Sequence, residues 1–394
     1  MRQFRIGSAF GIPLKLDLTF LLVLPLFAWI IGSQVAVWAD QLGELGAPAL
    51  DTAALTGGAM PWVLGIVAAV GLFAGVVLHE LGHSVVAMRF GYPIESITLW
   101  IFGGIAQLEQ MPEAWRQELA IAIAGPIVSV GLAGACWVGF LAMPTGLPAI
   151  RFVLGYLALM NVALAGFNLL PAFPMDGGRV LRALLARNRP YARATKIAAE
   201  VGKGFALLLG LVGLLQVNIV LIGIAFFIYI GASGEAQQTV MKAAFEGVRV
   251  RDIMTPIDDV QTISPDTTVA ELIDTMFRQR HTGYPVVERG SLVGLVTLED
   301  AREVKPVERE AYLVKEIMTR ELETVSAEAE AIKAVNEMRS AGVGRLIVND
   351  GGDFVGLVTR SDLVTALDII QSGGDVARRA GFGREADPTS GGLL

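Results

Sequence analysis

Two histidines and a glutamate stand together in residues 77–84, whose sequence is Val-Leu-His-Glu-Leu-Gly-His-Ser. On a helix, His79 and His83 lie one turn apart on one face, so both imidazoles can reach a single metal ion. In hydrolases with this H-E-x-x-H spacing the ion is usually zinc, with one coordination position left open for water. Glu80 adjoins the first histidine and can take a proton from that water and return it to a leaving amine.

An alternative is that these are core histidines of an ordinary helix. The chain has three histidines in all, and two of them fall in this motif. The motif also lies at the end of an apolar run, residues 61–90, that is long enough to cross a bilayer. Ionisable groups within such a span are energetically expensive and are functional by default. The pattern therefore favours a metal site.

A third ligand is expected in residues 167–179, whose sequence is Phe-Asn-Leu-Leu-Pro-Ala-Phe-Pro-Met-Asp-Gly-Gly-Arg. Proline ends the preceding helix and the glycine pair allows a sharp turn, so we expect Asp176 in a non-helical segment at membrane depth. Alternatively, Asp176 only caps the following helix. Asn168 could donate its amide to a developing oxyanion, or it could make a hydrogen bond between helices.

Composition indicates a membrane protein with a second, water-soluble part. Of the 394 residues 53% are hydrophobic and only 18% are charged, which is too apolar for a soluble globular protein. From Arg249 onward the charge density becomes ordinary, so at least two domains are expected. The net charge of −7 argues against nucleic acid as a partner. The single cysteine, Cys136, excludes a disulfide framework within the chain and a cysteine-based zinc site.

The hydrophobic runs predict a polytopic α-helical membrane domain with short β elements. A hairpin is expected in residues 3–17, followed by six transmembrane helices near residues 18–38, 61–88, 119–143, 152–170, 205–215 and 219–230. With six spans and the N-terminus inside, nearly all loop Lys and Arg residues fall on the cytoplasmic side of the cell membrane. The metal site then faces the cytoplasmic leaflet, and the C-terminal domain is cytoplasmic as well.

The two motifs together match a known family. The pairing of His79-Glu80-x-x-His83 with Asn168-x-x-Pro171-x-x-x-x-Asp176-Gly177 resembles the site-2 proteases, which are intramembrane zinc metalloproteases of regulated intramembrane proteolysis. The resemblance covers residues 1–235. It implies that His79, His83 and Asp176 ligate zinc, that Glu80 is the general base and that Asn168 assists the tetrahedral intermediate. Two further segments resemble family positions, Phe102-Gly103-Gly104 and Ala124-Gly125-Pro126.

Members of that family cleave membrane-spanning segments of other proteins, so the resemblance implies a transmembrane substrate. A transmembrane helix hides its carbonyl groups in hydrogen bonds and must be unwound locally before water can attack. An exposed strand edge could hold the opened segment by main-chain pairing. We expect this edge in residues 96–107, which include Phe102, Gly103 and Gly104. The alternative is an ordinary interfacial loop that covers the site.

The C-terminal part contains an internal repeat. Residues 250–255, Val-Arg-Asp-Ile-Met-Thr, recur as Val-Lys-Glu-Ile-Met-Thr at 314–319, and Gly-Leu-Val-Thr at 294–297 recurs at 356–359. Two matches at similar offsets predict a duplicated α/β unit. These copies resemble tandem CBS domains, expected at about 249–305 and 312–371 of a soluble module spanning 249–371. A linker is expected at 236–248 and a disordered tail at 372–394.

CBS pairs commonly bind adenine nucleotides, so the resemblance implies a nucleotide partner. By that resemblance the nucleotide would meet the threonine and aspartate of each G-x-x-T-x-x-D segment, namely Thr297, Asp300, Thr359 and Asp362. Thr-x-x-Asp is also an ordinary helix N-terminus. Many such pairs bind no ligand and instead form homodimers.

The sequence thus predicts a zinc metalloendopeptidase that cuts within or near transmembrane segments and is regulated by a cytoplasmic CBS pair. The alternative is a CBS-gated transporter or channel in which the ionisable residues line an ion path. A transporter of this size is expected to show internal repeats within its spans, and none is evident. An inactive scaffold is disfavoured because every catalytic position of the family is present.

Overall fold

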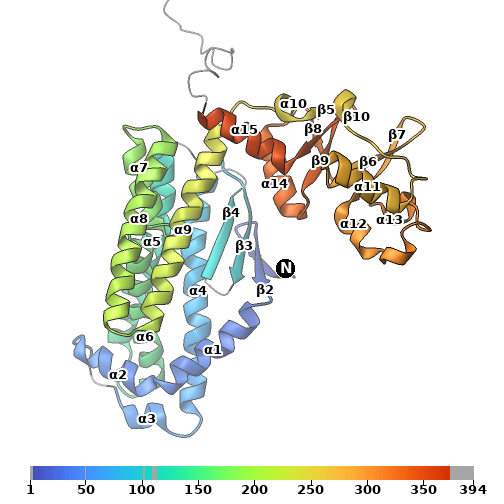
Figure 1. Cartoon of the computed structure of the whole chain (residues 1–394). Coiled ribbons are helices and arrows are strands. Elements are labelled where there is room, and N and C mark those ends of the chain that lie inside the picture. The colour runs from blue at the N-terminus through green and yellow to red at the C-terminus, as the bar shows by residue number, and fades with distance from the viewer. Residues whose placement is uncertain (1–2, 49, 101–102, 109–111, 113, 373–394) are drawn as a thin grey trace, which may run out of the picture. The chain divides into compact units, whose positions relative to one another are not determined.

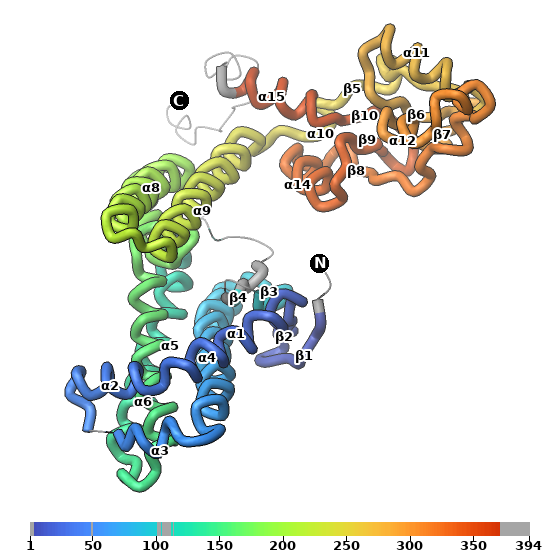
Figure 2. The backbone as a smooth tube through the Cα atoms, turned by 60° about the horizontal axis from the view of Figure 1, so that its bottom comes forward, coloured from blue at the N-terminus to red at the C-terminus, as the bar shows by residue number. Residues whose placement is uncertain are grey.

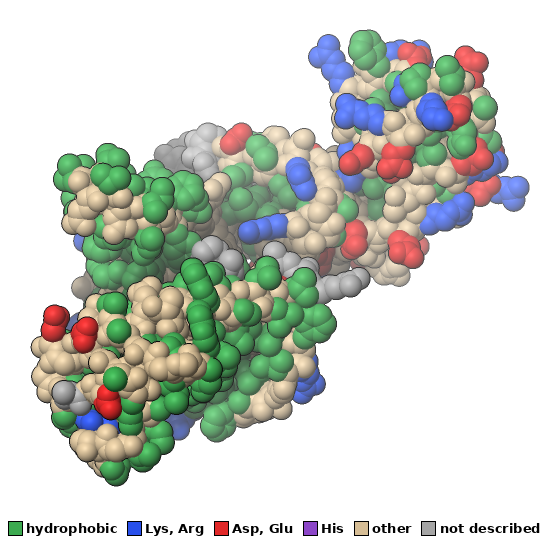
Figure 3. Space-filling view, turned by 90° about the horizontal axis from the view of Figure 1, so that it is seen from below, with side chains coloured by type: hydrophobic (Ala, Val, Ile, Leu, Met, Phe, Trp, Pro, Cys, Tyr) green, Lys and Arg blue, Asp and Glu red, His purple; other side chains and the backbone are tan. Residues whose placement is uncertain are grey.

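The structure is a computed structural model that describes residues 3–48, 50–100, 103–108, 112 and 114–372. Its contacts divide the chain into two units, Met1–Gln237 and Gln238–Leu394. Hydrophobic side chains cover much of the visible face of the first unit, whereas Lys, Arg, Asp and Glu are concentrated on the second (Figure 3). This contrast is the one that composition predicts for a membrane domain and a water-soluble module.

The first unit is a bundle of long apolar helices (Figure 1). Among the described residues, five helices are long and apolar enough to cross a membrane: α4 (Met60–Arg89), α5 (Trp115–Ala142), α6 (Pro148–Asn168), α8 (Tyr191–Leu215) and α9 (Ile219–Ala244). A sixth span results if α1 (Phe20–Ser33) and α2 (Val35–Glu44), which meet at 64°, are taken together. The short helices are α3 (Thr52–Thr56) and α7 (Asp176–Ala186). The expected multi-pass helical domain is confirmed.

Helix α4 lies at the centre of this bundle and packs against α1, α5 and α6. Between membrane helices the driving force is close packing rather than the hydrophobic effect, so small residues gather at the contacts. A Cβ on Gly65 would lie 2.2 Å from the carbonyl oxygen of Ala28 in α1. A Cβ on Gly82 would lie 2.9 Å from the carbonyl oxygen of Ala124 in α5. Glycine therefore sets how closely the neighbouring helices approach the helix with the two histidines.

A four-stranded sheet lies beside α4 (Figure 2). Its strands, in spatial order, are β1 (Gln3–Ala9), β2 (Ile12–Asp17), β3 (Ile94–Trp100) and β4 (Gly103–Leu108). The pairs β1–β2 and β3–β4 are antiparallel, whereas β2–β3 is parallel. The expected N-terminal hairpin is confirmed, and its tip is formed by Phe10 and Gly11 at positive φ. Buried Ile12 and Ile97 pack against Leu81 of α4, so the sheet is fixed to the motif helix.

The second unit contains the two sequence copies. The first copy comprises α10 (Val250–Ile253), β5 (Thr255–Pro256), α11 (Val269–Gln279), β6 (Gly283–Glu288), β7 (Ser291–Thr297) and α12 (Leu298–Glu303). The second comprises α13 (Val314–Ile317), β8 (Thr324–Ser326), α14 (Ala331–Ala341), β9 (Arg345–Asp350), β10 (Asp353–Thr359) and α15 (Arg360–Ser372). The predicted duplicated α/β module is confirmed.

Each copy completes the other. Strand β5 of the first copy pairs with β10 of the second, and Thr319 of the second copy bridges to Leu295 in β7 of the first. Side chains are exchanged as well. Val250 of the first copy is buried in the core of the second, and Val314 of the second copy is buried in the core of the first. The two copies thus share their sheets and cores.

The stretch expected as a linker, residues 236–248, is mostly helical because α9 continues to Ala244. The next residue, Phe245, is 1% exposed and packs in the core of the second copy. Helix α9 therefore passes the boundary between the units at Gln237 without ending. Most of the expected disordered tail lies outside the described residues.

Candidate metal centre

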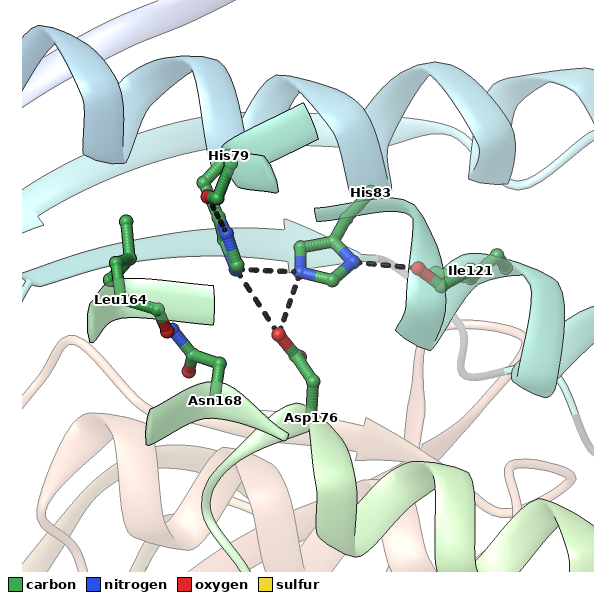
Figure 4. A network of polar contacts seen from close by, with 7 residues as sticks. His79, His83, Ile121, Leu164, Asn168 and Asp176 are labelled. Atoms are coloured by element: carbon green, nitrogen blue, oxygen red, sulfur yellow. Dashed lines mark hydrogen bonds and ion pairs between the residues drawn. The ribbon is translucent and has the colours of Figure 1, made fainter. Parts of the chain in front are cut away.

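Three ligand atoms meet where α4 faces the start of α7 (Figure 4). The Nε2 atoms of His79 and His83 lie 3.2 Å apart. Asp176 Oδ2 lies 3.1 Å from His79 Nε2 and 3.0 Å from His83 Nε2. All three residues are buried, and among the described residues this is the one cluster of ligand atoms close enough to share an ion. The structure thus brings together the three ligands that the sequence predicts.

The hydrogen bonds behind the two rings show that this donor set fits a metal ion. His83 Nδ1 donates to the carbonyl oxygen of Ile121 at 2.6 Å, so the proton of the neutral ring sits on Nδ1 and Nε2 carries a free lone pair. His79 Nδ1 lies 2.8 Å from Ser129 Oγ. Such hydrogen bonds orient metal-bound histidines. Two imidazole nitrogens and one carboxylate oxygen facing one another suit a zinc ion.

Helix α5 touches the two rings at a glycine. A Cβ on Gly125 would lie 2.2 Å from His83 Nε2 and 2.7 Å from His79 Nε2. Ile121 and Ser129, which hold the outer nitrogens of the rings, stand one turn before and after this glycine on the same helix. One face of α5 therefore orients both histidines while leaving space for their inner nitrogens.

Asp176 reaches the site differently from the sequence prediction. It is the first residue of α7 rather than part of a non-helical segment, and its carboxylate faces the histidines. The expected sharp turn at the glycine pair is also wrong, because Gly177 and Gly178 are both helical. A Cβ on Gly177 would lie 2.2 Å from the carbonyl oxygen of Leu170. This glycine lets the start of α7 pack onto the backbone that follows α6.

Glu80 belongs to the same helix as the histidines but meets the sheet. A Cβ on Gly104 in β4 would lie 2.6 Å from Glu80 Cγ. Gly104 therefore permits the strand to lie directly against the glutamate side chain. Phe102 lies outside the described residues, and Gly103 is the first residue of β4. The predicted substrate edge and the predicted general base are thus in contact through Gly104.

Asn168 is the last residue of α6 and lies beside the cluster (Figure 4). Its side-chain amide donates to the carbonyl oxygen of Leu164, 3.0 Å away in the same helix. The hydrogen bond between helices that the sequence allowed is replaced by this local one. The role of Asn168 at an oxyanion stays a prediction; the hydrogen bond to Leu164 uses one of the two N–H donors of the amide.

A buried ion cluster next to the metal centre was not foreseen from the sequence. Arg182 of α7 is 1% exposed, and its Nε donates to Glu118 of α5 at 2.6 Å. A second guanidinium nitrogen donates to Glu235 of α9. The guanidinium also lies 4.9 Å from the ring centroids of Phe173 and Tyr191. Arg182 thus joins α7, which begins with Asp176, to α5, which orients the histidines, and to α9.

The second unit holds a cavity of about 470 Å³ between its two copies. Thr297 and Asp300 line it, whereas Thr359 and Asp362 do not. The threonine hydroxyl in both pairs donates to its aspartate, at 2.7 Å and 2.8 Å, in the helix-capping arrangement that the sequence allowed. Of the four predicted nucleotide residues, two therefore face this space.

Arg345 provides positive charge in the same cavity. One guanidinium nitrogen donates to Thr282 Oγ1 at 2.9 Å, and Gly283 leaves room for the side chain because a Cβ there would overlap it. Burial lowers the pKa of Arg345 below its ordinary value, and the Asp300 carboxylate opposes that shift. A guanidinium beside hydroxyl and carboxylate groups could recognise a phosphorylated sugar.

Comparison with known proteins gives two family matches. The model for Peptidase family M50 matches residues 67–148 and 145–209, and that for the CBS domain matches residues 250–306 and 314–369. The chain is similar to Zinc metalloprotease MJ0392 of Methanocaldococcus jannaschii, with 35% identity over 93% of this chain and 96% of the relative. It is also similar to Putative zinc metalloprotease Rip3 of Mycobacterium tuberculosis, with 34% identity over 92% of both chains.

Among solved structures the chain is similar to the Site-2 Protease from Methanocaldococcus jannaschii. The two sequences are 36% identical, and the match covers 60% of this chain and 95% of that structure with a TM-score of 0.40.

Substitution of Gly125 tests the geometry of the metal centre. We expect Gly125→Ala to lower the bound zinc at least tenfold, because the added methyl group would occupy the space of the inner ring nitrogens. Gly134→Ala on the same helix is the matched control, since its Cβ would meet no atom within 4 Å. Metal analysis of the purified proteins measures both. Full zinc content in Gly125→Ala would contradict the arrangement.

Substitution of Arg182 tests the ion cluster. Arg182→Met leaves Glu118 and Glu235 without their counter-charge, and breaking a buried ion pair from one side costs about 3–5 kcal/mol. We therefore expect a lower thermal unfolding midpoint and partial recovery when Glu118→Gln and Glu235→Gln are added. Arg189→Met, at an exposed arginine, is the control. If Arg182→Met unfolds with the same thermal midpoint as wild type, the ion cluster does not stabilise the fold.

Proposed function

Because this chain belongs to peptidase family M50 and carries a CBS pair, we propose that it is a zinc metalloprotease that hydrolyses peptide bonds within or near transmembrane segments. The observation that carries the proposal is the convergence of His79, His83 and Asp176 inside a bundle of apolar helices. A soluble protease keeps such a site at a water-filled surface. Here the site lies where substrates with long apolar segments can approach it.

His79, His83 and Asp176 hold the zinc ion in this proposal, and Glu80 is the general base. A zinc ion, when bound, acts as a Lewis acid that activates water and polarises the scissile carbonyl. Glu80 takes the proton from the attacking water and returns it to the leaving nitrogen. Asn168 donates to the oxyanion with the amide N–H that is not bound to Leu164. The Ile121 carbonyl keeps His83 in the tautomer that directs a free Nε2 inward, and Ser129 orients the His79 ring through Nδ1.

Strand β4 receives the unwound substrate. It is the last strand of the sheet, so one of its edges has no partner strand among the described residues. A substrate segment can pair with that edge by main-chain hydrogen bonds, which require no particular sequence. Contact between Gly104 and Glu80 then brings the paired segment to the general base. This arrangement supports Gly103 and Gly104 as substrate-binding residues. Phe102 stays a substrate-binding residue predicted from the sequence.

The metal centre and the CBS pair face the cytoplasm in this proposal. The support is the charge bias of the sequence, in which the basic residues flank the ends of the spans on the side of the N-terminus. The last of these spans, α9, leads directly into the second unit.

Adenine nucleotides bound between the two CBS copies regulate the protease, and Thr297, Asp300 and Arg345 contact them. Regulation requires that the nucleotide favour one arrangement of the membrane domain over another. Helix α9 supports such a link, since it carries Glu235 of the buried ion cluster and continues to Ala244, next to the buried Phe245. Homodimerisation of the CBS pair stays a prediction from the sequence.

Cleavage of a tagged transmembrane segment in proteoliposomes tests the catalytic roles. We expect Glu80→Gln to retain zinc and to lose cleavage by about 10²–10⁴-fold, the contribution of a general base. Gly104→Ala should also retain zinc and cleave more slowly, because its methyl group would displace the Glu80 side chain. Gly7→Ala in the same sheet is the control, with no atom near its Cβ. A wild-type protein without stoichiometric zinc would refute the proposal.

Cleavage rates with AMP, ADP, ATP and no nucleotide test regulation. We expect at least one nucleotide to change the rate, and Arg345→Ala to weaken its binding about tenfold because a charge-assisted hydrogen bond is lost. Arg278→Ala, an exposed arginine outside the cavity, should bind normally. Calorimetry on the full-length protein measures binding. Equal rates under all four conditions would exclude nucleotide regulation.

A further inference from the structure

An apolar groove of about 780 Å³ runs between α4 and α5, apart from the metal centre. We refer to it as the α4–α5 groove. Its walls are hydrophobic side chains from both helices, including Leu78, Val85, Val86, Leu119, Ile123 and Ile127. Leu78 is 42% exposed and Ile127 is 63% exposed. Since both helices are long enough to cross the membrane, the groove is a recess open to the bilayer.

The groove lies on the side of α4 that faces away from Glu80. Successive residues of an α-helix are separated by 100°, from 3.6 residues per turn. Leu78, Val85 and Arg89 therefore form one stripe, and Glu80 lies roughly 160° from Leu78 around the helix. Glu80 instead contacts β4. A peptide lying in the groove could not present its backbone to Glu80, so the groove is not the path to the general base.

Positive charge is concentrated at one end of the groove. Arg89 is the last residue of α4 and Arg116 lies in the first turn of α5, and both line the groove and are exposed. The Trp115 ring lies 5.2 Å from the guanidinium carbon of Arg116 and 5.7 Å from that of Arg187.

Two aromatic side chains place this end at the membrane surface. Trp115 lines the groove beside Arg116. Phe10, at the tip of the N-terminal hairpin, also lines it and is 77% exposed. Trp next to Lys or Arg is typical of the interface between hydrocarbon and headgroups, and an exposed Phe at a hairpin tip can enter the hydrocarbon beside it. The guanidinium groups therefore lie at headgroup depth, and the apolar walls extend from there into the hydrocarbon region.

We propose that the α4–α5 groove binds an anionic phospholipid, with an acyl chain along the apolar walls and the phosphate at Arg89 and Arg116. Guanidinium groups pair with phosphate oxygens through two parallel hydrogen bonds. The cytoplasmic leaflet, on which the charge bias places these residues, is the anionic one. A substrate helix is the other candidate occupant, but an apolar helix does not use the two arginines.

Such a lipid would contact both helices that build the metal centre. Helix α4 carries His79 and His83, and α5 carries Ser129 and Ile121 behind them. A lipid seated across the two helices would favour their present packing. Lipid binding itself does not depend on the proposed protease function, because it is measured without cleavage.

Lipid retention by the full-length protein tests the proposal. Protein reconstituted in equal phosphatidylglycerol and phosphatidylcholine is returned to detergent, and the retained lipids are quantified by native mass spectrometry. We expect wild type to retain at least fivefold more phosphatidylglycerol than phosphatidylcholine. The double variant Arg89→Gln/Arg116→Gln should lose that preference. Arg189→Gln, an exposed arginine outside the groove, should keep it. Val85→Trp should reduce retention of phosphatidylglycerol by filling the groove.

Two outcomes would overturn the proposal. The first is equal retention of the two lipids by wild type, which needs no variant and is independent of folding defects. The second is capture of a model transmembrane substrate, rather than phosphatidylglycerol, by a photocrosslinker placed at Val86. That result would assign the groove to substrate docking.

Discussion

The structure depends on holding three candidate metal-ligand atoms about 3 Å apart inside an apolar helix bundle. Two lone pairs and a carboxylate repel one another until a cation lies among them, so the helices that carry them must be fixed by other contacts. Helix α5 supplies two of these contacts, Ile121 and Ser129, and makes room at Gly125. Arg182 supplies the third by tying α7 to α5 and α9.

Local spacing was enough to predict the first half of the site. His79 and His83 are four residues apart on one helix, and helix geometry alone brings them together. The proline and glycine pattern of residues 167–179 predicts Asp176 as the third ligand, but it predicts a turn where the structure has the first residue of a helix. Glycine here serves close packing against the carbonyl oxygen of Leu170, which only the tertiary structure reveals.

Local sequence patterns do not predict contacts between residues that are far apart in the chain. Arg182 is 64 residues from Glu118 and 53 from Glu235, so no local spacing predicts that these three side chains meet. The polar residues after the last apolar run also lead to a wrong prediction for the end of α9. The stretch Gly-Glu-Ala-Gln-Gln at 234–238 suggested a linker, but Ala, Glu and Gln are good helix formers, so the helix continues to Ala244.

The exchange of segments between the CBS copies has a consequence for how the module folds and fails. Removal of the first copy would take strand β5 from the second copy's sheet and Val250 from its core. Removal of the second copy would take the Thr319 bridge from β7 and Val314 from the core of the first. Neither copy is then a separable building block, and the pair should denature as one cooperative body. A nick or truncation between the copies would therefore act on both at once, so half of this module cannot serve as a smaller sensor.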